Sequence, residues 1–240
     1  MGSEMCIRDR SASAPLDKSI VVFDLDGTLV DSGRDLIATL NRVIATEGLP
    51  AIADEHVGHL VGQGSLKMLD KAYKYYERPL EGDLKKQLHK MFLESYEANI
   101  AVHTVPFEGV IETLEALKAD GWILAVCTNK YEGMSKKLLK ILEMDHYFAG
   151  ICGSDTYPVR KPDPKHLWGT IEDCGGAFNR AIMVGDSATD VNTAKAADIP
   201  VIGVPFGYTD IPMVDLQPTR LVEHYRDMRA AIDSIAADFT

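Results

Sequence analysis

The stretch Phe23-Asp24-Leu25-Asp26-Gly27-Thr28-Leu29 is central to the predicted fold, because it joins an apolar run to an acidic turn. The preceding run, Ser19-Ile20-Val21-Val22, is short and β-branched, which predicts a strand buried on both faces, as in a parallel sheet. Asp24 and Asp26 are two positions apart and would share one face of an extended strand end. Asp and Gly are also ordinary turn residues, so the stretch alone is equally compatible with a plain turn.

Similar apolar runs recur along the chain and alternate with helical patterns. Further strands are predicted at 123–127, 150–152, 181–184 and 200–204. Apolar residues follow helical spacing over 110–119, 134–142, 188–197 and 228–237. Strands that alternate with helices predict an α/β fold with a doubly wound parallel sheet, whose ligands bind at the carboxyl ends of the strands.

One interval breaks this alternation. Asp26 and Pro106 are 80 positions apart with no convincing strand between them, whereas a strand-to-strand crossover needs only about 30 residues. Amphipathic helical patterns fill the interval over 34–47, 65–76 and 81–99. An insertion beside the mouth of the first strand should lie over the site as a lid. We therefore expect residues 18–32 and 106–240 to form an α/β core domain, and 33–105 an inserted all-α cap domain.

Composition narrows the possible partners. The chain has 25 Lys plus Arg against 36 Asp plus Glu, and a net charge of −11 disfavours nucleic acid and anionic membranes. No apolar run approaches the ~20 residues that span a bilayer. The four cysteines form no C-x-x-C pair, which favours free thiols and a cytoplasmic location. Residues 1–17 show no periodicity and are expected to be a disordered lead or an artefact outside the fold.

A second acidic element follows the predicted strand at 181–184. In the run Gly185-Asp186-Ser187-Ala188-Thr189-Asp190, Asp186 stands at the strand end and is a candidate ligand for magnesium, which prefers oxygen ligands. Ser187 could cap the next helix, and Asp190 could lie in its first turn, where the helix dipole favours an acid. Whether Asp190 also contacts a metal directly stays open.

Polar and basic residues follow two other predicted elements. Thr128-Asn129 ends the run 123–127 and could hold a phosphate oxygen, although such a pair is also a common helix cap. The next residue, Lys130, is compatible with a position that simply faces solvent. Lys161 lies in the proline-rich turn 160–164, which could hold its charge against a transferring phosphoryl group. A solvated surface lysine is the alternative.

Taken together, these elements resemble the four motifs of the haloacid dehalogenase-like hydrolase superfamily. The motifs stand here as Asp24-Leu25-Asp26-Gly27-Thr28, Thr128, Lys161 and Gly185-Asp186-Ser187-Ala188-Thr189-Asp190, and the likeness covers roughly 20–233. The resemblance implies that Asp24 attacks phosphorus and that Asp26 protonates the leaving alcohol and then activates water. It implies that Mg²⁺ is bound by Asp24, by the backbone carbonyl of Asp26 and by Asp186. Thr128 and Lys161 would then hold the phosphoryl group.

The insertion resembles the type-one helical cap of this superfamily, and the chain is most similar to its phosphoglycolate phosphatases. Leu60-Val61-Gly62-Gln63-Gly64-Ser65 resembles the Gly-x-Gly loop that those enzymes place over the substrate. The resemblance implies substrate binding by Gly62, Gln63 and Gly64, together with Asn129; a plain loop between helices is the alternative. The runs 152–155 and 71–76 depart from the family pattern and leave the substrate open.

The hypothesis is therefore a Mg²⁺-dependent phosphatase for a small phosphate ester, first of all 2-phosphoglycolate, acting as a monomer or homodimer. Relatives with the same motifs leave a sugar-phosphate phosphatase or mutase, a pyrophosphatase and a nucleotidase as alternatives. Asp26 favours a phosphatase over a dehalogenase, because a halide leaving group needs no proton. A non-catalytic sensor of a phosphorylated metabolite is a different class, and the complete set of motif residues argues against it.

Overall fold

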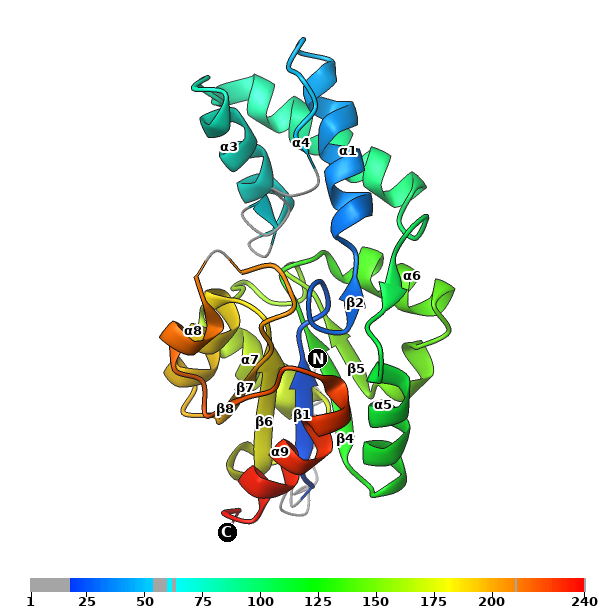
Figure 1. The fold of residues 1–240 in the computed structure, drawn as a ribbon, viewed down its shortest axis with the longest axis vertical. Helices are drawn as coiled ribbons and strands as arrows, with labels where there is room; N and C mark the ends of the chain where they lie inside the picture. The colour runs from blue at the N-terminus through cyan, green and yellow to red at the C-terminus, as the bar shows by residue number, and fades with distance from the viewer. Residues whose placement is uncertain (1–17, 54–59, 62–63, 210, 240) are drawn as a thin grey trace, which may run out of the picture.

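A six-stranded parallel sheet forms the centre of the molecule. The computed structural model describes residues 18–53, 60–61, 64–209 and 211–239. The strands run in the order β5-β4-β1-β6-β7-β8, and every neighbouring pair is parallel (Figure 1). They are β1 (Ile20–Phe23), β4 (Ile123–Cys127), β5 (Gly150–Cys152), β6 (Ala181–Gly185), β7 (Val201–Gly203) and β8 (Arg220–Leu221). The predicted doubly wound α/β sheet is confirmed, with β8 as an additional edge strand.

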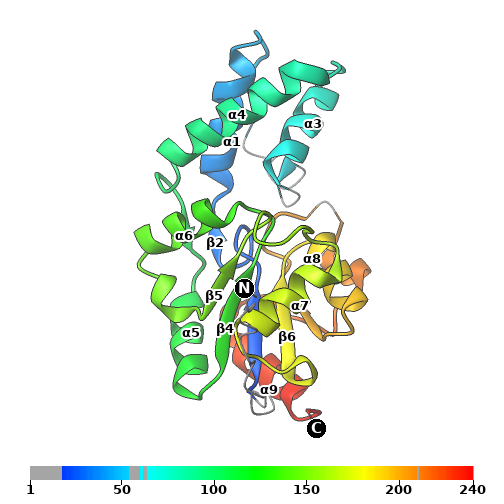
Figure 2. The same cartoon turned by 180° about the vertical axis from the view of Figure 1, so that it is seen from behind.

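Helices cover both faces of the sheet, and β1 contributes to both cores. Val21 and Phe23 lie in a core with α5 (Val110–Ala119), α6 (Glu132–Ile141) and α9 (Met228–Ala236). Ile20 and Val22 lie in a second core with α7 (Pro164–Asp173) and α8 (Ala188–Ala196), which is seen from behind in Figure 2. Burial on both faces explains why β1 is continuously apolar. Helix α7, which begins in the 160–164 turn, was not among the helices predicted from apolar spacing.

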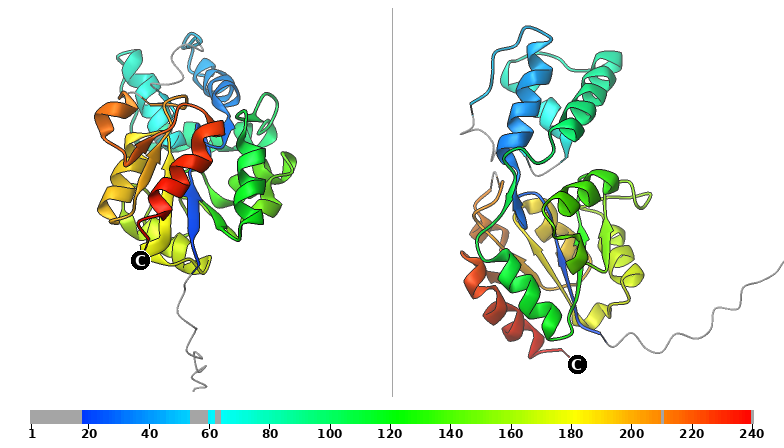
Figure 3. Two further views of the ribbon diagram at one scale, coloured as in Figure 1. Left: turned by 60° about the horizontal axis from the view of Figure 1, so that its bottom comes forward. Right: turned by 90° about the vertical axis from the view of Figure 1, so that its right-hand side faces the viewer.

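The helices of the insertion lie beyond the carboxyl ends of the strands. They are α1 (Gly33–Ala45), α3 (Ser65–Tyr75) and α4 (Gly82–Ala98), and α4 packs against both of the others (Figures 1 and 3). Leu40, Leu69 and Phe92 are among the buried side chains of this layer. The placement matches the lid geometry expected from the sequence, while the division into two domains stays a prediction. No helix in the described ranges combines the length and apolarity that crossing a bilayer requires.

Two short strands fasten the connections between the insertion and the core. β2 (Val30–Asp31) pairs antiparallel with β3 (Val105–Pro106), so the expectation of a strandless interval was wrong at its two ends. Asp35, buried in the first turn of α1, accepts hydrogen bonds from the backbone N–H groups of His103 and Thr104 and from the Thr104 hydroxyl, the last at 2.7 Å. The entering and leaving segments are therefore joined side by side above β1.

Candidate active site

The site begins at the end of β1, where Asp24 is followed by a tight turn. Asp24 still follows the strand, because its N–H donates to the Val184 carbonyl at 2.9 Å. Gly27 then turns the chain with φ of +87°, a conformation that L side chains rarely adopt. A β-carbon at Gly27 would also clash with a carboxylate oxygen of Asp186. The turn thus requires glycine for both its backbone conformation and its close approach to the next acidic group.

Three buried carboxyl groups lie close together, and two of them contact the ammonium group of Lys161. Oxygens of Asp24, Asp186 and Asp190 all lie within 4.8 Å of one another. The Nζ atom of Lys161 lies 2.9 Å from Asp24 Oδ1 and 2.6 Å from Asp190 Oδ1. Burial raises the pKa of Asp24 to about 6, against the opposing effect of Lys161. With all three acids ionised, the cluster carries two uncompensated negative charges, so its charge and its oxygen donors suit a divalent cation.

Asp186 is held in place by groups from the β1 turn and from the loop after β7. Its Oδ1 accepts a hydrogen bond from the Thr28 hydroxyl at 3.0 Å, and its Oδ2 accepts one from the Tyr208 N–H at 2.6 Å. Burial, followed by the charges of Asp190 and Asp24, raises the pKa of Asp186 well above its usual range. Each oxygen has one protein donor, and a carboxylate oxygen can accept more than one contact, so Asp186 can also hold a metal.

Asp190 serves two partners at once. It forms the capping box of α8, in which its Oδ2 accepts from both the N–H and the hydroxyl of Ser187. Its Oδ1 accepts from Lys161 at 2.6 Å. The expected place of Asp190 in the first turn of α8 is therefore confirmed. The same side chain also holds the Lys161 ammonium group in position.

Lys161 is buried, so the alternative of a solvated surface lysine is wrong. Its side chain is 1% exposed, and its backbone N–H donates to His166 Nδ1 at 3.1 Å. The Asn129 amide donates to the Lys161 carbonyl at 3.1 Å. These contacts fix the backbone on both sides of the lysine, and α7 begins directly after Asp163, which caps it.

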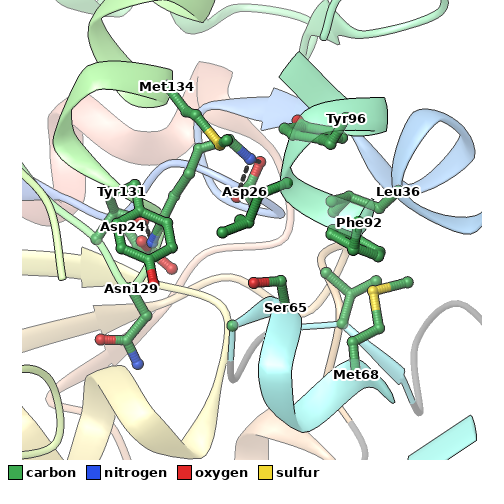
Figure 4. Close-up of a pocket in the computed structure, with 15 residues that line it drawn as sticks. Asp24, Asp26, Leu36, Ser65, Met68, Phe92, Tyr96, Asn129, Tyr131 and Met134 are labelled. Carbon is green, nitrogen blue, oxygen red and sulfur yellow. Dashed lines mark hydrogen bonds and ion pairs between the residues drawn. The ribbon is translucent and has the colours of Figure 1, made fainter. Parts of the chain in front are cut away.

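A pocket opens between these residues and the helices of the insertion. Asp24, Asp26, Thr128, Asn129 and Gly64 all line it (Figure 4). Its opposite wall is apolar and consists mainly of side chains from the inserted helices, among them Leu36, Met68, Phe92 and Tyr96. The predicted site residues Gly62 and Gln63 lie outside the described residues. Five of the residues predicted from the sequence therefore line the same cavity.

Lys130 is the site residue whose position the sequence left undecided. Its Nζ atom donates to both oxygens of Asp26, at 2.8 and 2.7 Å, and lies 4.4 Å from the centre of the Tyr96 ring (Figure 4). The Ser32 hydroxyl also donates to Asp26, at 2.6 Å. Burial alone would lower the pKa of Lys130, but Asp26 and Tyr96 raise it above its usual value. A solvent-facing position is therefore wrong, and the one sequence signal was its place directly after Thr128-Asn129.

Comparison with known proteins agrees with these motifs. A family model described as haloacid dehalogenase-like hydrolase matches residues 21–204. A phosphoglycolate phosphatase of Agrobacterium fabrum is 44% identical over 92% of this chain and 94% of its own length. One of Mesorhizobium japonicum is 43% identical over 88% of this chain and 92% of its own. A crystal structure of a predicted phosphoglycolate phosphatase from Haemophilus somnus, 32% identical, superposes with a TM-score of 0.82 over 89% of this chain and 97% of that one.

The buried His166 makes the fold sensitive to acid. Burial, followed by the charge of Lys161, lowers the pKa of His166 to about 4 from 6.5. The stabilising contribution of neutral His166 to the fold is complete above pH 6.5. It is lost as the pH falls toward 4, because in that range this histidine readily takes up a proton only in the unfolded chain. The free energy of unfolding should fall by up to about 1.4 kcal/mol per pH unit from this group.

Urea unfolding of His166→Gln should show a shallower loss of stability over that pH range than the wild type. His224→Gln, which changes an exposed histidine, should keep the wild-type slope. An unchanged slope in His166→Gln would contradict the assignment.

Proposed function

Because the chain belongs to the haloacid dehalogenase-like hydrolase family, we propose that it is a Mg²⁺-dependent phosphatase that passes a phosphoryl group from a small ester to Asp24 and then to water. The substrate proposed is 2-phosphoglycolate, cleaved to glycolate and phosphate. The observation that carries the proposal is the buried cluster of Asp24, Asp186, Asp190 and Lys161, at the edge of a pocket that also contains Asp26. Relatives that bear the name phosphoglycolate phosphatase support the choice of substrate.

Asp24 is the proposed nucleophile. It is held at the end of β1 by the ion pair with Lys161, and it reaches the pocket wall. In the first step a bond forms between a carboxylate oxygen of Asp24 and phosphorus, and the bond from phosphorus to the leaving oxygen breaks. The charge of Lys161 and the donors of Thr128 and Asn129 stabilise the phosphoryl oxygens during this transfer.

Asp26 is the proposed acid and base. Its contacts with Lys130 and Ser32 hold its carboxyl group toward the pocket, apart from the Asp24 cluster. In the first step Asp26 gives a proton to the leaving oxygen. In the second step it takes a proton from water, whose oxygen attacks phosphorus while the bond to Asp24 breaks. Phosphate leaves, and both carboxyl groups return to their starting states.

The metal proposal rests on the charge of the cluster. Asp24 and Asp186, together with the backbone carbonyl of Asp26, would hold Mg²⁺. When bound, the ion supplies positive charge that offsets the negative charge of the carboxylates and of the phosphoryl oxygens. Lys161 alone leaves that charge only partly compensated.

The inserted helices are the proposed cap domain over the substrate, with 33–105 as the cap and 18–32 and 106–240 as the core. Gly64 lines the pocket at the start of α3, and with Gly62 and Gln63 it belongs to the proposed substrate loop. The free thiols of Cys127 and Cys152 fit action in the reducing cytoplasm. Action as a monomer or homodimer completes the proposal.

Replacing the nucleophile tests the proposal directly. Asp24→Asn should lower phosphate release from 2-phosphoglycolate by on the order of 10³-fold or more, because an amide is a far weaker nucleophile than a carboxylate. Circular dichroism should show a retained fold, since the side chains have nearly the same shape. Asp83→Asn, at an exposed position of α4, should keep the wild-type rate. A wild-type rate in Asp24→Asn would contradict the role of Asp24 as nucleophile. If the wild type had a higher kcat/KM for a hexose phosphate or pyrophosphate than for 2-phosphoglycolate, the proposed substrate would be wrong.

Mg²⁺ should stabilise the fold through Asp186. At a concentration of about 100 times its Kd, the ion should add roughly 2.7 kcal/mol and raise Tm by about 5 to 10 °C. Asp186→Asn should lose most of this rise, whereas Asp83→Asn should keep it. Differential scanning fluorimetry with and without Mg²⁺ measures both shifts, and an equal rise in Asp186→Asn would exclude Asp186 as a ligand.

A further inference from the structure

The charges of the pocket wall are few and unevenly placed. Among the described residues that line the pocket, the charged side chains are Asp24, Asp26 and Lys130. Lys161 lies behind Asp24 and is not part of this lining. The inserted helices contribute mainly apolar side chains to the opposite wall. Lys130 is therefore the one cation among the described residues that line the pocket, whereas the charge of Lys161 acts on the phosphoryl group from beside Asp24.

Lys130 is held in a fixed direction. Asp26 accepts two of its N–H donors, and the Tyr96 ring lies against the ammonium group at 4.4 Å. The Lys130 side chain is 6% exposed. An ammonium group has three donors, and Asp26 accepts two of them, which leaves the third for the neighbouring Tyr96 or for a ligand. Because the Lys130 side chain is already held in place, it can bind another anion with little further loss of side-chain entropy.

The substrate class of the proposed function brings such an anion. In 2-phosphoglycolate the carboxylate carbon is two bonds from the leaving oxygen. Asp26 acts on that leaving oxygen in the proposed mechanism, and Lys130 contacts Asp26. The substrate carboxylate is therefore within reach of Lys130. Burying that carboxylate against the apolar wall without a cation would be strongly unfavourable.

We propose that Lys130 is a specificity-determining residue, which binds a carboxylate carried on the leaving alcohol and so selects small anionic phosphate esters. This inference rests on the proposed function. It differs from a role in orienting Asp26 alone, because orientation of Asp26 would affect every ester alike. Selection by charge would affect only those esters that carry the second anion.

A matched pair of substrates separates these roles. The kcat/KM of the full chain with Mg²⁺ is measured for 2-phosphoglycolate and for its neutral amide, 2-phosphoglycolamide. The wild type should prefer the acid, and Lys130→Met should reduce the ratio of acid to amide on the order of 10- to 100-fold, as expected for loss of a charged hydrogen bond. Lys130→Arg should keep part of the preference. Lys140→Met, on the exposed side of α6, should leave the ratio unchanged.

Two outcomes distinguish this inference from the function on which it rests. If the wild type hydrolyses neither ester, the proposed function fails and this inference fails with it. If the wild type prefers the acid but Lys130→Met loses both activities equally, this inference alone is overturned. Should Lys130→Met not fold, Lys130→Gln replaces it, and the wild type gives an independent measure. Glycolate should then inhibit competitively at concentrations on the order of tenfold lower than glycolamide, and equal inhibition would overturn the inference.

Discussion

The site depends on the ion pairs that the buried ammonium group of Lys161 forms with two carboxylates. This group lies between Asp24, at the end of β1, and Asp190, in the first turn of α8. Removing one partner of such a buried ion pair typically costs about 3 to 5 kcal/mol, because the remaining charge is left without compensation. The parallel sheet makes this arrangement possible, since it brings the carboxyl ends of β1 and β6 to one edge. The charges of the proposed catalytic site and part of the fold stability are therefore supplied by the same side chains.

A second set of contacts ties this charge cluster to the inserted helices. The N–H of Tyr208 donates to Asp186, while its hydroxyl donates to Asp31 and accepts from the Gly33 N–H at 2.6 Å. Tyr208 thus joins a proposed metal ligand to the segment that enters the insertion. On the other side of the pocket, Lys130 of the core lies against Tyr96 of α4. The two layers meet through polar contacts that converge on the acidic residues.

Much of this arrangement follows from local sequence. Continuous apolar runs predicted the strands, because burial on both faces leaves little room for polar residues. The acidic residues Asp24, Asp26 and Asp186 were predicted to belong to the site because they follow the ends of these strands. The family resemblance is confirmed by the matching family model and by relatives at 43 and 44% identity. The two-residue strands β2 and β3 were missed because their pairing joins segments far apart in sequence and leaves no periodic signal.

The direction of long side chains was the part that sequence could not supply. Lys130 and Lys161 were both compatible with solvent, yet both are buried against carboxylates. Their orientation depends on elements distant in the chain: Asp26 and Tyr96 for Lys130, and Asp190 for Lys161. Lys161 had a local signal in its neighbouring prolines, which mark a rigid turn, whereas Lys130 had little beyond its place after Thr128-Asn129.

The covalent role of Asp24 is the central claim, and chemical trapping tests it most directly. Enzyme turning over 2-phosphoglycolate is quenched in acid and reduced with borohydride, which converts an acyl-phosphorylated aspartate to homoserine, and peptide mass spectrometry then locates the change. The account predicts homoserine at position 24 and unchanged aspartate at position 26. Modification at another residue would contradict the account. So would an unmodified Asp24, provided that phosphate is released and that a known aspartyl-phosphate is trapped in a parallel reaction.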